Sequence, residues 1–285
     1  MPKTYNDLYI DLRRRLREAG VEADTLEAAL LVAHAAGKNY AKLMADLRLY
    51  TSQEVEERTL TLAQRRLAGE PAAYIIGSWS FCGLDLTVNE SVLIPRSDTE
   101  VLVETALDLS GKSDSSLRIL DLCTGSGCVG IALARFLPDS RVVLADVSPA
   151  ALRVAKENIR RCGLGTRALA VGADVLHSPS PQLGSFDLIV CNPPYIPARE
   201  IPTLDASVRE HEPLLALDGG EDGLRFYRAI LGGWKSLLRQ SGWLCFEVGE
   251  TQAGDVERLM RLAGLRSLGR VKDSAGYDRV VYGRL

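Results

Sequence analysis

The sequence is poor in the residue patterns that hold metal ions or build disulfide frameworks. It has three histidines and six cysteines in 285 residues, and no two cysteines form a C-x-x-C pair. Structural zinc sites usually show closely spaced ligand pairs, so we predict no metal site. Scattered cysteines in a chain of this size are typical of reduced thiols in the cytosol, and we expect a cytoplasmic protein.

The chain also lacks an excess of positive charge and any long apolar run. Lysine and arginine number 34 against 37 aspartates and glutamates, which gives a net charge of −3. Nucleic-acid binding through a broad face needs clustered basic residues, so we expect no direct nucleic-acid partner. No run approaches the roughly 18 apolar residues of a membrane span, and the charged N-terminus is not typical of a signal peptide. We therefore expect no membrane partner.

What is present is an ordinary globular composition, 46% hydrophobic and 25% charged, in a length that suits about two domains. Residues 1–73 are predicted to form a helical domain, because Leu8, Leu12 and Leu16 recur at helical spacing. Two further helices are expected to begin at pairs with capping-box spacing: Asp24 with Glu27, and Thr51 with Glu54.

The rest of the chain changes to β and then to alternating β and α patterns. Residues 74–92 are predicted to be a β-hairpin linker, with strand from Tyr74 and turns at Gly-Ser and Cys-Gly. Residues 93–285 are predicted to be a Rossmann-like α/β domain with a mostly parallel sheet. The expected strands are 117–122, 142–146, 168–171, 186–191 and 243–248, the helices 129–136, 149–161, 224–238 and 253–262, and a terminal hairpin 268–272 with 279–282.

A glycine-rich loop follows the first of these strands. In DLCTGSGCVG, Gly125, Gly127 and Gly130 fit G-x-G-x-x-G, which lets a backbone turn tightly against a ligand. Asp146 ends the next strand, where a carboxylate can accept hydrogen bonds from both ribose hydroxyls of a nucleoside. Asp121 in the loop suits a cationic ligand better than a pyrophosphate. These residues predict an adenosine ligand, either a dinucleotide or S-adenosylmethionine.

Two residues after the third strand complete this expected pocket. Asp174 is placed to contact the adenine edge, and Val175 lies beside it. An ordinary strand-end turn is the alternative interpretation of this pair.

The segment FDLIVCNPPYIP predicts the chemistry. A buried strand delivers Asn192, Pro193, Pro194 and Tyr195 to the carboxyl edge of the sheet. The prolines have no N–H groups, so the Asn192 side-chain oxygen and the Pro193 carbonyl present two acceptors in a rigid frame. Such a frame can hold a planar NH2 group by both hydrogens, while Tyr195 offers a face for stacking. An amide or aromatic amine nitrogen held in this way can attack an electrophilic methyl group.

Three segments occur together in this chain: SVLIPRSDTE, DLCTGSG and NPPYIP. In this combination the chain resembles the release factor glutamine-N5 methyltransferases, the PrmC/HemK family of class I methyltransferases. The resemblance extends through EPLLALDGGEDGL, FEVGETQ and KDSAGYDRVVYG. It implies methyl transfer from S-adenosylmethionine to the glutamine of the Gly-Gly-Gln motif of peptide-chain release factors. We expect the helical domain to dock this large protein substrate. Cofactor residues are then expected at Cys123, Thr124, Gly125, Ser126, Gly127, Asp146, Asp174, Val175 and Asn192, substrate residues at Asn192, Pro193, Pro194 and Tyr195, and catalytic residues at Asn192, Pro193 and Tyr195.

Two positions, Cys123 and Ser97, depart from the family pattern. A third residue, Arg96, follows the pattern and is given only a supporting role. Cys123 stands where the family usually has glycine, and we expect ordinary backbone there with the thiol facing the cofactor. Ser97 stands in place of a proline, and Ser97 with Glu100 is expected to form a capping box that starts the next helix. Arg96 is expected only to support the mouth of the site.

Three other functions fit parts of the sequence. A DNA adenine-N6 amino-methyltransferase shares NPPY but needs a target-recognition region and a basic cleft. An NAD-dependent dehydrogenase would explain the glycines and gives no use for Asn192 and its prolines. A non-enzymatic binding module would leave the affinity for a cofactor unexplained.

Overall fold

The computed structural model describes residues 2–111 and 116–285 and divides the chain into two compact units. One unit comprises Met1–Gly77 with Ala206–His211, and the other comprises Ser78–Asp205 with Glu212–Leu285. The boundaries expected after residues 73 and 92 remain predictions. Within these described ranges, no helix is both long enough and apolar enough to cross a membrane.

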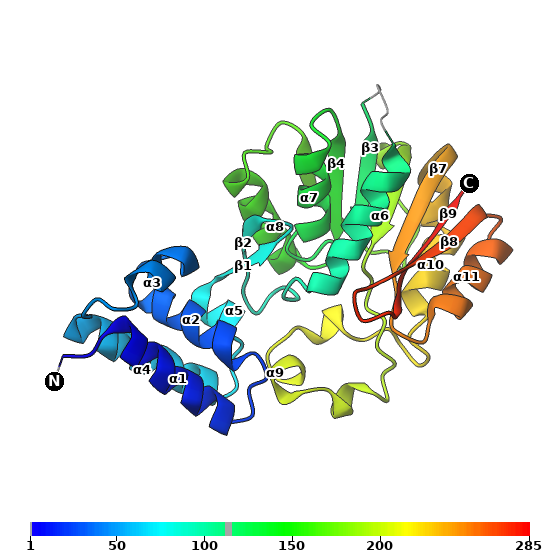
Figure 1. Ribbon diagram of the computed structural model, residues 1–285. Helices are drawn as coiled ribbons and strands as arrows, with labels where there is room; N and C mark the ends of the chain where they lie inside the picture. The colour runs from blue at the N-terminus through cyan, green and yellow to red at the C-terminus, as the bar shows by residue number, and fades with distance from the viewer. Residues whose placement is uncertain (1, 112–115) are drawn as a thin grey trace. The chain divides into compact units, whose positions relative to one another are not determined.

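The first unit is helical, as its leucine spacing predicts (Figure 1). Leu8, Leu12 and Leu16 line the buried face of α1 and pack in one core with Leu31 and Leu43. Leucines at this spacing share one face of a helix, which explains why the three are buried together. The helices are α1 (Tyr5–Glu18), α2 (Asp24–Ala35), α3 (Tyr40–Asp46), α4 (Gln53–Leu67), α5 (Ala72–Ile76) and α9 (Ala206–Arg209).

Both predicted capping pairs are wrong in detail. The residue that precedes α2 is Ala23, whose methyl group cannot accept a capping hydrogen bond, and the Asp24 carboxylate instead accepts a hydrogen bond from Arg17 Nε at 2.6 Å. Helix α4 begins one residue later than the pattern predicts, because Ser52 rather than Thr51 caps its first turn. An ion pair with a nearby arginine, which the local spacing does not reveal, determined the role of Asp24.

The predicted hairpin linker is half right. Strands β1 (Ser78–Phe81) and β2 (Leu84–Thr87) pair antiparallel around Cys82 and Gly83, both with positive φ, as a two-residue hairpin turn requires. Residues 74–76, however, are the end of helix α5 rather than a strand. Pro71 precedes this helix and Gly77 ends it at φ 77°, so the Gly-Ser pair is a helix terminus and not a β-turn.

The second unit has a seven-stranded sheet in the order β5-β4-β3-β6-β7-β9-β8, in which β9 runs antiparallel to its neighbours (Figure 1). This sheet confirms the Rossmann-like prediction. The order reverses between β3 and β6, where such sheets open a crevice at their carboxyl ends. The strands are β3 (Arg118–Leu122), β4 (Arg141–Asp146), β5 (Ala168–Gly172), β6 (Phe186–Cys191), β7 (Leu238–Glu247), β8 (Arg266–Lys272) and β9 (Asp278–Arg284).

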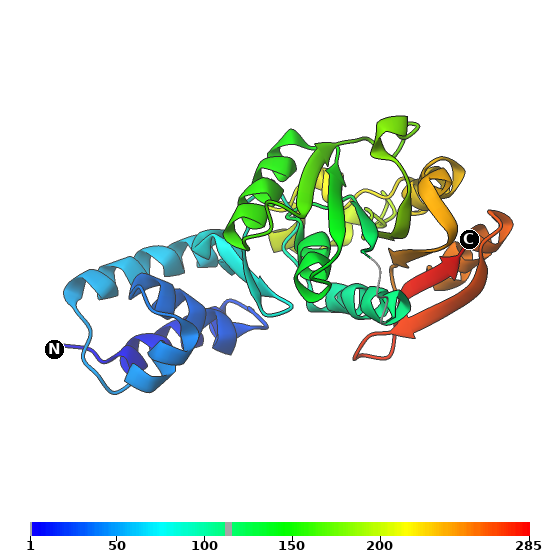
Figure 2. The ribbon, with the colours of Figure 1, turned by 90° about the horizontal axis from the view of Figure 1, so that it is seen from above.

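Helices cover both faces of this sheet (Figure 2). One apolar core joins the sheet to α6 (Glu100–Ser110), α7 (Cys128–Phe136) and α8 (Pro149–Arg161), and the other joins it to α10 (Arg225–Gly232) and α11 (Ala253–Leu262). The short 3-10 helices are η1 (Ser97–Thr99), η2 (Pro181–Leu183), η3 (Ile201–Thr203), η4 (Leu214–Ala216) and η5 (Trp234–Leu237).

One predicted helix is too long and the strand after it too short. The pattern predicts a helix over 224–238 and a strand from Trp243, but α10 ends at Gly232 and β7 already begins at Leu238. Two consecutive glycines, Gly232 and Gly233, weaken the helix at that point. The apolar residues that follow form η5 and the start of the strand.

Candidate active site

A cavity opens at the carboxyl ends of β3, β4, β5 and β6, the place that the strand order predicts. It brings together most of the residues expected from the sequence: Cys123, Thr124, Gly125, Ser126, Asp146, Asp174, Val175, Asn192 and Pro194. Gly127, Pro193 and Tyr195 lie next to these residues in the chain but are not part of the cavity wall. The other walls come from the segment before α6, from η4 and from Phe226.

The three glycines of the loop serve different purposes. Gly125 has φ 55°, and a Cβ atom built on it would meet no other atom within 4 Å, so this glycine leaves free space at the cavity wall. A Cβ on Gly127 would lie 2.9 Å from both Ile131 and Leu144, so Gly127 allows α7 to pack against the sheet. A Cβ on Gly130 would lie 2.9 Å from an Asp121 oxygen. Of these three glycines, Gly125 is therefore the one that leaves room for a ligand, and the other two allow close packing within the protein.

Asp121 anchors the glycine loop through two hydrogen bonds. Its Oδ2 atom accepts the backbone N–H of Gly130 at 2.9 Å and a hydrogen bond from the Thr124 hydroxyl. Burial raises the pKa of this carboxyl to about 7, although both hydrogen bonds lower it, and the negative charge of Asp146 raises it further. The expected attraction of Asp121 for a cationic ligand is thus secondary to its role as an anchor of the loop.

Asp146 ends β4 with its carboxylate at the cavity wall. Oδ2 accepts the N–H of Gly125 at 2.8 Å, and Oδ1 accepts the N–H of Ser148 at 2.9 Å. Burial is the main cause that raises the pKa of this group, and the backbone hydrogen bonds oppose the shift. Each carboxylate oxygen can accept more than one hydrogen bond, so Asp146 can fix the loop and still accept from two hydroxyl groups.

Asp174 and Val175 follow β5 and line the cavity beside Phe226. The Asp174 carboxylate lies 2.8 Å from His177 Nδ1 and accepts the N–H of Leu176 at 2.9 Å. The buried Val175 side chain packs in the same core as Phe226. This end of the cavity thus offers two apolar side chains and one carboxylate, a set that suits the flat face and amino edge of a purine.

The expectation of ordinary backbone at Cys123 is wrong. Cys123 has φ 55°, a left-handed conformation that costs a residue with a Cβ atom roughly 1–2 kcal/mol. The tight turn from β3 into the glycine loop requires this conformation, which explains why glycine suits the position. Cys123 does line the cavity, and the orientation of its thiol towards a cofactor stays a prediction.

Asn192 lies at the end of β6 with its amide group oriented by its neighbours. Its Nδ2 atom donates to Thr99 Oγ1 at 3.2 Å, and both residues line the cavity. With the NH2 group directed at Thr99, the Oδ1 atom of Asn192 is the amide atom left to accept from a ligand. The two prolines that follow have no N–H to offer, so the only hydrogen-bonding backbone atoms they contribute are acceptors.

Tyr195 is held from several sides. Its carbonyl oxygen accepts from Gln252 Nε2 at 2.9 Å, and a Cβ on Gly219 would lie 2.8 Å from its backbone. Burial raises the pKa of its phenol well above the usual range, with the Glu247 carboxylate adding to the shift. The Tyr195 ring therefore stays neutral and its backbone is fixed.

The segment before α6 does not start in the way the sequence predicts. Ser97 lies inside η1 rather than at a cap position, since Arg96 precedes η1 and Thr99 precedes α6. The carboxylate of Glu100 accepts the Cys82 N–H at 2.6 Å in the hairpin turn. The capping box is therefore absent. Arg96 instead pairs with the buried Glu212, which also accepts the Ile94 N–H at 3.1 Å. This ion pair joins two segments that contribute to the cavity wall, a role larger than the support expected for Arg96.

Sequence reasoning missed Thr99 and Glu247. Glu247 ends β7 with its side chain buried, and burial raises its pKa to about 7, while hydrogen bonds from Thr99 and Asn192 and the positive charge of Arg279 lower it. The only signal for these two residues is their presence in the quoted segments SVLIPRSDTE and FEVGETQ.

The cavity suits an adenosine ligand with a cationic group. It has open space at Gly125, a carboxylate with acceptor capacity at Asp146 and apolar side chains at Val175 and Phe226. Asp121 and Asp146 both accept hydrogen bonds from the loop backbone, and a positive group beside them would favour their charged forms, which burial disfavours. Over residues 2–111 and 116–285 no three metal-ligating side chains cluster as a metal site would need.

Comparison with known proteins places both parts of the chain in described families. Residues 7–77 match the model of the PrmC N-terminal domain, and residues 97–210 match the methyltransferase small domain. A release factor glutamine methyltransferase of Moorella thermoacetica is 43% identical over 93% of this chain and 93% of its own length. A release factor glutamine methyltransferase of Geobacter sulfurreducens is 40% identical over 96% of this chain and 94% of its own.

Solved structures support the fold. The hMettl16 catalytic domain superposes with a TM-score of 0.56 over 80% of this chain and 81% of its own, at 17% identity. A methyltransferase from Pyrococcus furiosus superposes with a TM-score of 0.52 over 80% of this chain and 98% of its own, at 15% identity. Likeness at this level of identity extends to the methyltransferase fold alone.

Proposed function

This chain belongs to the release factor glutamine methyltransferase family, and on that premise we propose that it transfers a methyl group to the side-chain amide nitrogen, N5, of the glutamine in the Gly-Gly-Gln motif of peptide-chain release factors. Membership of the family makes the protein an enzyme whose methyl donor is S-adenosylmethionine. We assign it to the cytoplasm, where translation ends.

The donor supplies a methyl group on a positively charged sulfur, which makes that methyl electrophilic. In our proposal the loop from Cys123 to Gly127 surrounds the donor, and Asp146 accepts from its ribose hydroxyls. Asp174 accepts from the adenine amino group, and Val175 packs against the ring. Asn192 lies near both ligands, since it lines the same cavity.

The substrate glutamine is proposed to bind at Asn192, Pro193, Pro194 and Tyr195. Asn192 Oδ1 and the Pro193 carbonyl accept the two amide hydrogens, which places the nitrogen in line with the methyl group. As the nitrogen attacks, it gains positive charge, and both acceptors stabilise that charge. The neutral Tyr195 ring stacks on the flat amide group. The methylated nitrogen then loses a proton readily, so no strong base is needed.

The orientation of Asn192 is the observation that carries this proposal, because its NH2 group is bonded to Thr99 and its oxygen is left for a ligand. Incubation of the protein with purified release factor and S-adenosylmethionine is expected to add one methyl group to the Gly-Gly-Gln glutamine. Mass spectrometry of the tryptic peptide would detect it. A correctly folded factor that stays unmodified would refute the proposal.

An adenine-N6 methyltransferase acting on DNA is not favoured. The relatives that match nearly the whole chain are named for release factors, and the net charge of −3 offers no excess of positive charge for a nucleic-acid backbone. We propose that the enzyme acts on a protein without direct contact to nucleic acid.

We further propose that residues 1–73 form a docking domain for the protein substrate. Leu49 and Tyr50 are adjacent and largely exposed, at 56% and 71%, and such apolar side chains are typical anchors at interfaces. Changing both to serine is expected to raise KM for intact release factor about tenfold, because two apolar contacts are lost, with kcat unchanged.

The matched control is Leu262→Ser, which removes an exposed apolar side chain from α11 in the other unit. We expect this change to leave KM as it is. A short Gly-Gly-Gln peptide should be methylated equally well by all three proteins. Equal KM values for intact factor with the double variant would contradict docking through these residues.

A further inference from the structure

Glu247 stands beside the proposed substrate site without lining the cavity. Strands β6 and β7 pair in parallel, with Cys191 opposite Phe246, so Asn192 and Glu247 are the next residues on neighbouring strands. The Glu247 side chain is buried, and its Oε2 atom has no hydrogen-bond partner among the residues the structure describes. A buried carboxyl with an unsatisfied oxygen lowers the free energy of unfolding, so we expect Glu247 to have a functional role that offsets this loss.

The groups around Glu247 are unevenly arranged. Arg279 on β9 lowers the pKa of Glu247 through its positive charge, but its guanidinium also bonds to Asp273 at 2.9 Å and approaches Asp98 at 3.4 Å. The positive charge of Arg279 is therefore shared among three carboxylates and does not serve Glu247 alone. The polar side chains that hydrogen-bond to Glu247 are Thr99 and Asn192, the same two that bond to each other in the cavity wall.

From this arrangement we propose that Glu247 is a positioning residue that fixes the amide orientation of Asn192. The proposal rests on the proposed function of Asn192. An asparagine amide can be turned by half a rotation at little cost in shape, which exchanges its oxygen and its NH2 group. A carboxylate only accepts hydrogen bonds, and the Thr99 hydroxyl accepts from Asn192 while its own hydrogen is free to point at Glu247. Both neighbours therefore draw the NH2 group of Asn192 towards themselves and turn Oδ1 towards the substrate.

This role depends on the charge of Glu247. Once protonated, the carboxyl has a hydrogen to donate, and it then holds the NH2 group of Asn192 less firmly. The ionisable groups that interact with it come from five elements or their ends: Arg279 from β9, Asp98 from η1, Tyr195 after β6, Tyr227 from α10 and Cys128 from α7. The turnover number should therefore fall as the pH drops through the range in which Glu247 gains its proton.

The test is Glu247→Gln, which keeps the shape of the side chain and removes its charge. A glutamine can present an NH2 group to Asn192, so it no longer selects one orientation of the Asn192 amide. We expect kcat to fall at least tenfold at pH 8, with KM for S-adenosylmethionine unchanged, and the decline of kcat below pH 7 to become shallower than in the wild type. Burial also raises the pKa of Asp121 to about 7, so Asp121 contributes to the pH dependence of both proteins. The contribution of Glu247 is the difference between the pH profile of the wild type and that of Glu247→Gln.

A second pair of variants keeps the test independent of folding. Thr99→Val removes the hydroxyl that joins Asn192 to Glu247 and should lower kcat, whereas Thr99→Ser keeps a hydroxyl and should retain it. The combination of Glu247→Gln with Thr99→Val should cost less than the product of the two single effects, because both act on one amide. Additive losses, or an unchanged kcat and pH profile in Glu247→Gln, would overturn the inference. Failure of the wild type to methylate release factor would instead refute the proposed function.

Discussion

Replacing Asn192 by alanine is expected to lower kcat about a thousandfold while leaving S-adenosylmethionine binding nearly unchanged. The variant removes one of the two proposed acceptors that stabilise the charge on the attacking nitrogen, and loss of one such group typically costs two to three orders of magnitude. Thr99 and Glu247 each lose one side-chain hydrogen bond, while the backbone pairing of β6 with its neighbours is untouched, so the fold should be retained. Single-turnover methylation of release factor and calorimetric titration of the cofactor would measure the two effects.

Asn39→Ala provides the opposite pattern as a control. Asn39 caps α3 by accepting the Lys42 N–H at 2.8 Å, so its loss should cost about 1 kcal/mol of unfolding free energy and leave kcat as it is. If Asn192→Ala keeps kcat within tenfold of the wild type, Asn192 is not a catalytic residue. If it abolishes cofactor binding, Asn192 belongs to the donor site alone.

Replacing Asp146 by alanine is expected to raise the Kd of S-adenosylmethionine about a hundredfold. Two effects act together, because the carboxylate would accept the ribose hydroxyls and also holds the glycine loop through Gly125 and Ser148. Hydrogen bonds to a charged group contribute about 1.5–3 kcal/mol each, and two of them account for this loss. Asp146→Asn keeps one acceptor oxygen and should cost less, about tenfold.

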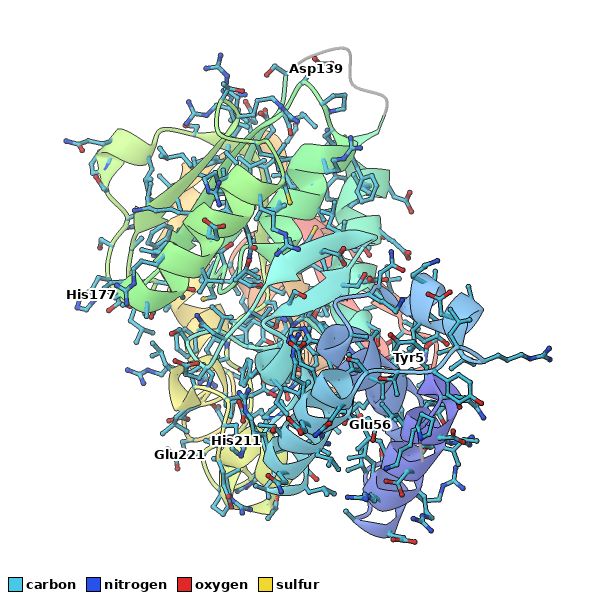
Figure 3. The ribbon with its side chains drawn as sticks, turned by 90° about the vertical axis from the view of Figure 1, so that its left-hand side faces the viewer. Tyr5, Glu56, Asp139, His177, His211 and Glu221 are labelled. Atoms are coloured by element: carbon cyan, nitrogen blue, oxygen red, sulfur yellow. The ribbon has the colours of Figure 1, made fainter. Side chains whose placement is uncertain are left out.

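Asp139→Ala is the matched control for the loss of one negative charge. Asp139 is exposed and precedes β4, whereas Asp146 ends the same strand at the cavity. Figure 3 shows Asp139 at the far end of the sheet from His177, which follows β5 on the cavity side. Equal Kd values for Asp146→Ala and the wild type would exclude Asp146 from the donor site.

Regular elements in the catalytic unit were predictable because their signals are local. The strand from Phe186 to Cys191 and the helix from Pro149 to Arg161 have the bounds that the sequence predicts. Buried parallel strands are continuous apolar runs, and helices between them show a 3.6-residue period. The glycine loop and Asn192 could be located for the same reason, since each directly follows such a strand.

The features that escaped prediction depend on partners far away in the sequence. Glu100 was expected to cap its own helix, but it bonds to Cys82 in the hairpin turn. Glu247 gained its significance from Asn192 on the neighbouring strand, which only the register of the sheet reveals. The positive φ of Cys123 is a property of the turn as folded, and a cysteine in the sequence gives no sign of it.

The division of the chain into units affects the order in which the protein can fold during synthesis. The first unit is discontinuous, because Ala206–His211, which includes α9, belongs with Met1–Gly77. Helices α1 to α5 leave the ribosome early, but their unit lacks its last segment until the chain has been translated past residue 211. At typical rates this delay is on the order of ten seconds. By then four strands of the seven-stranded sheet, β3 to β6, have already been made, so the first unit gains its last segment only after much of the second unit has been synthesised. The second unit is itself complete only at residue 285.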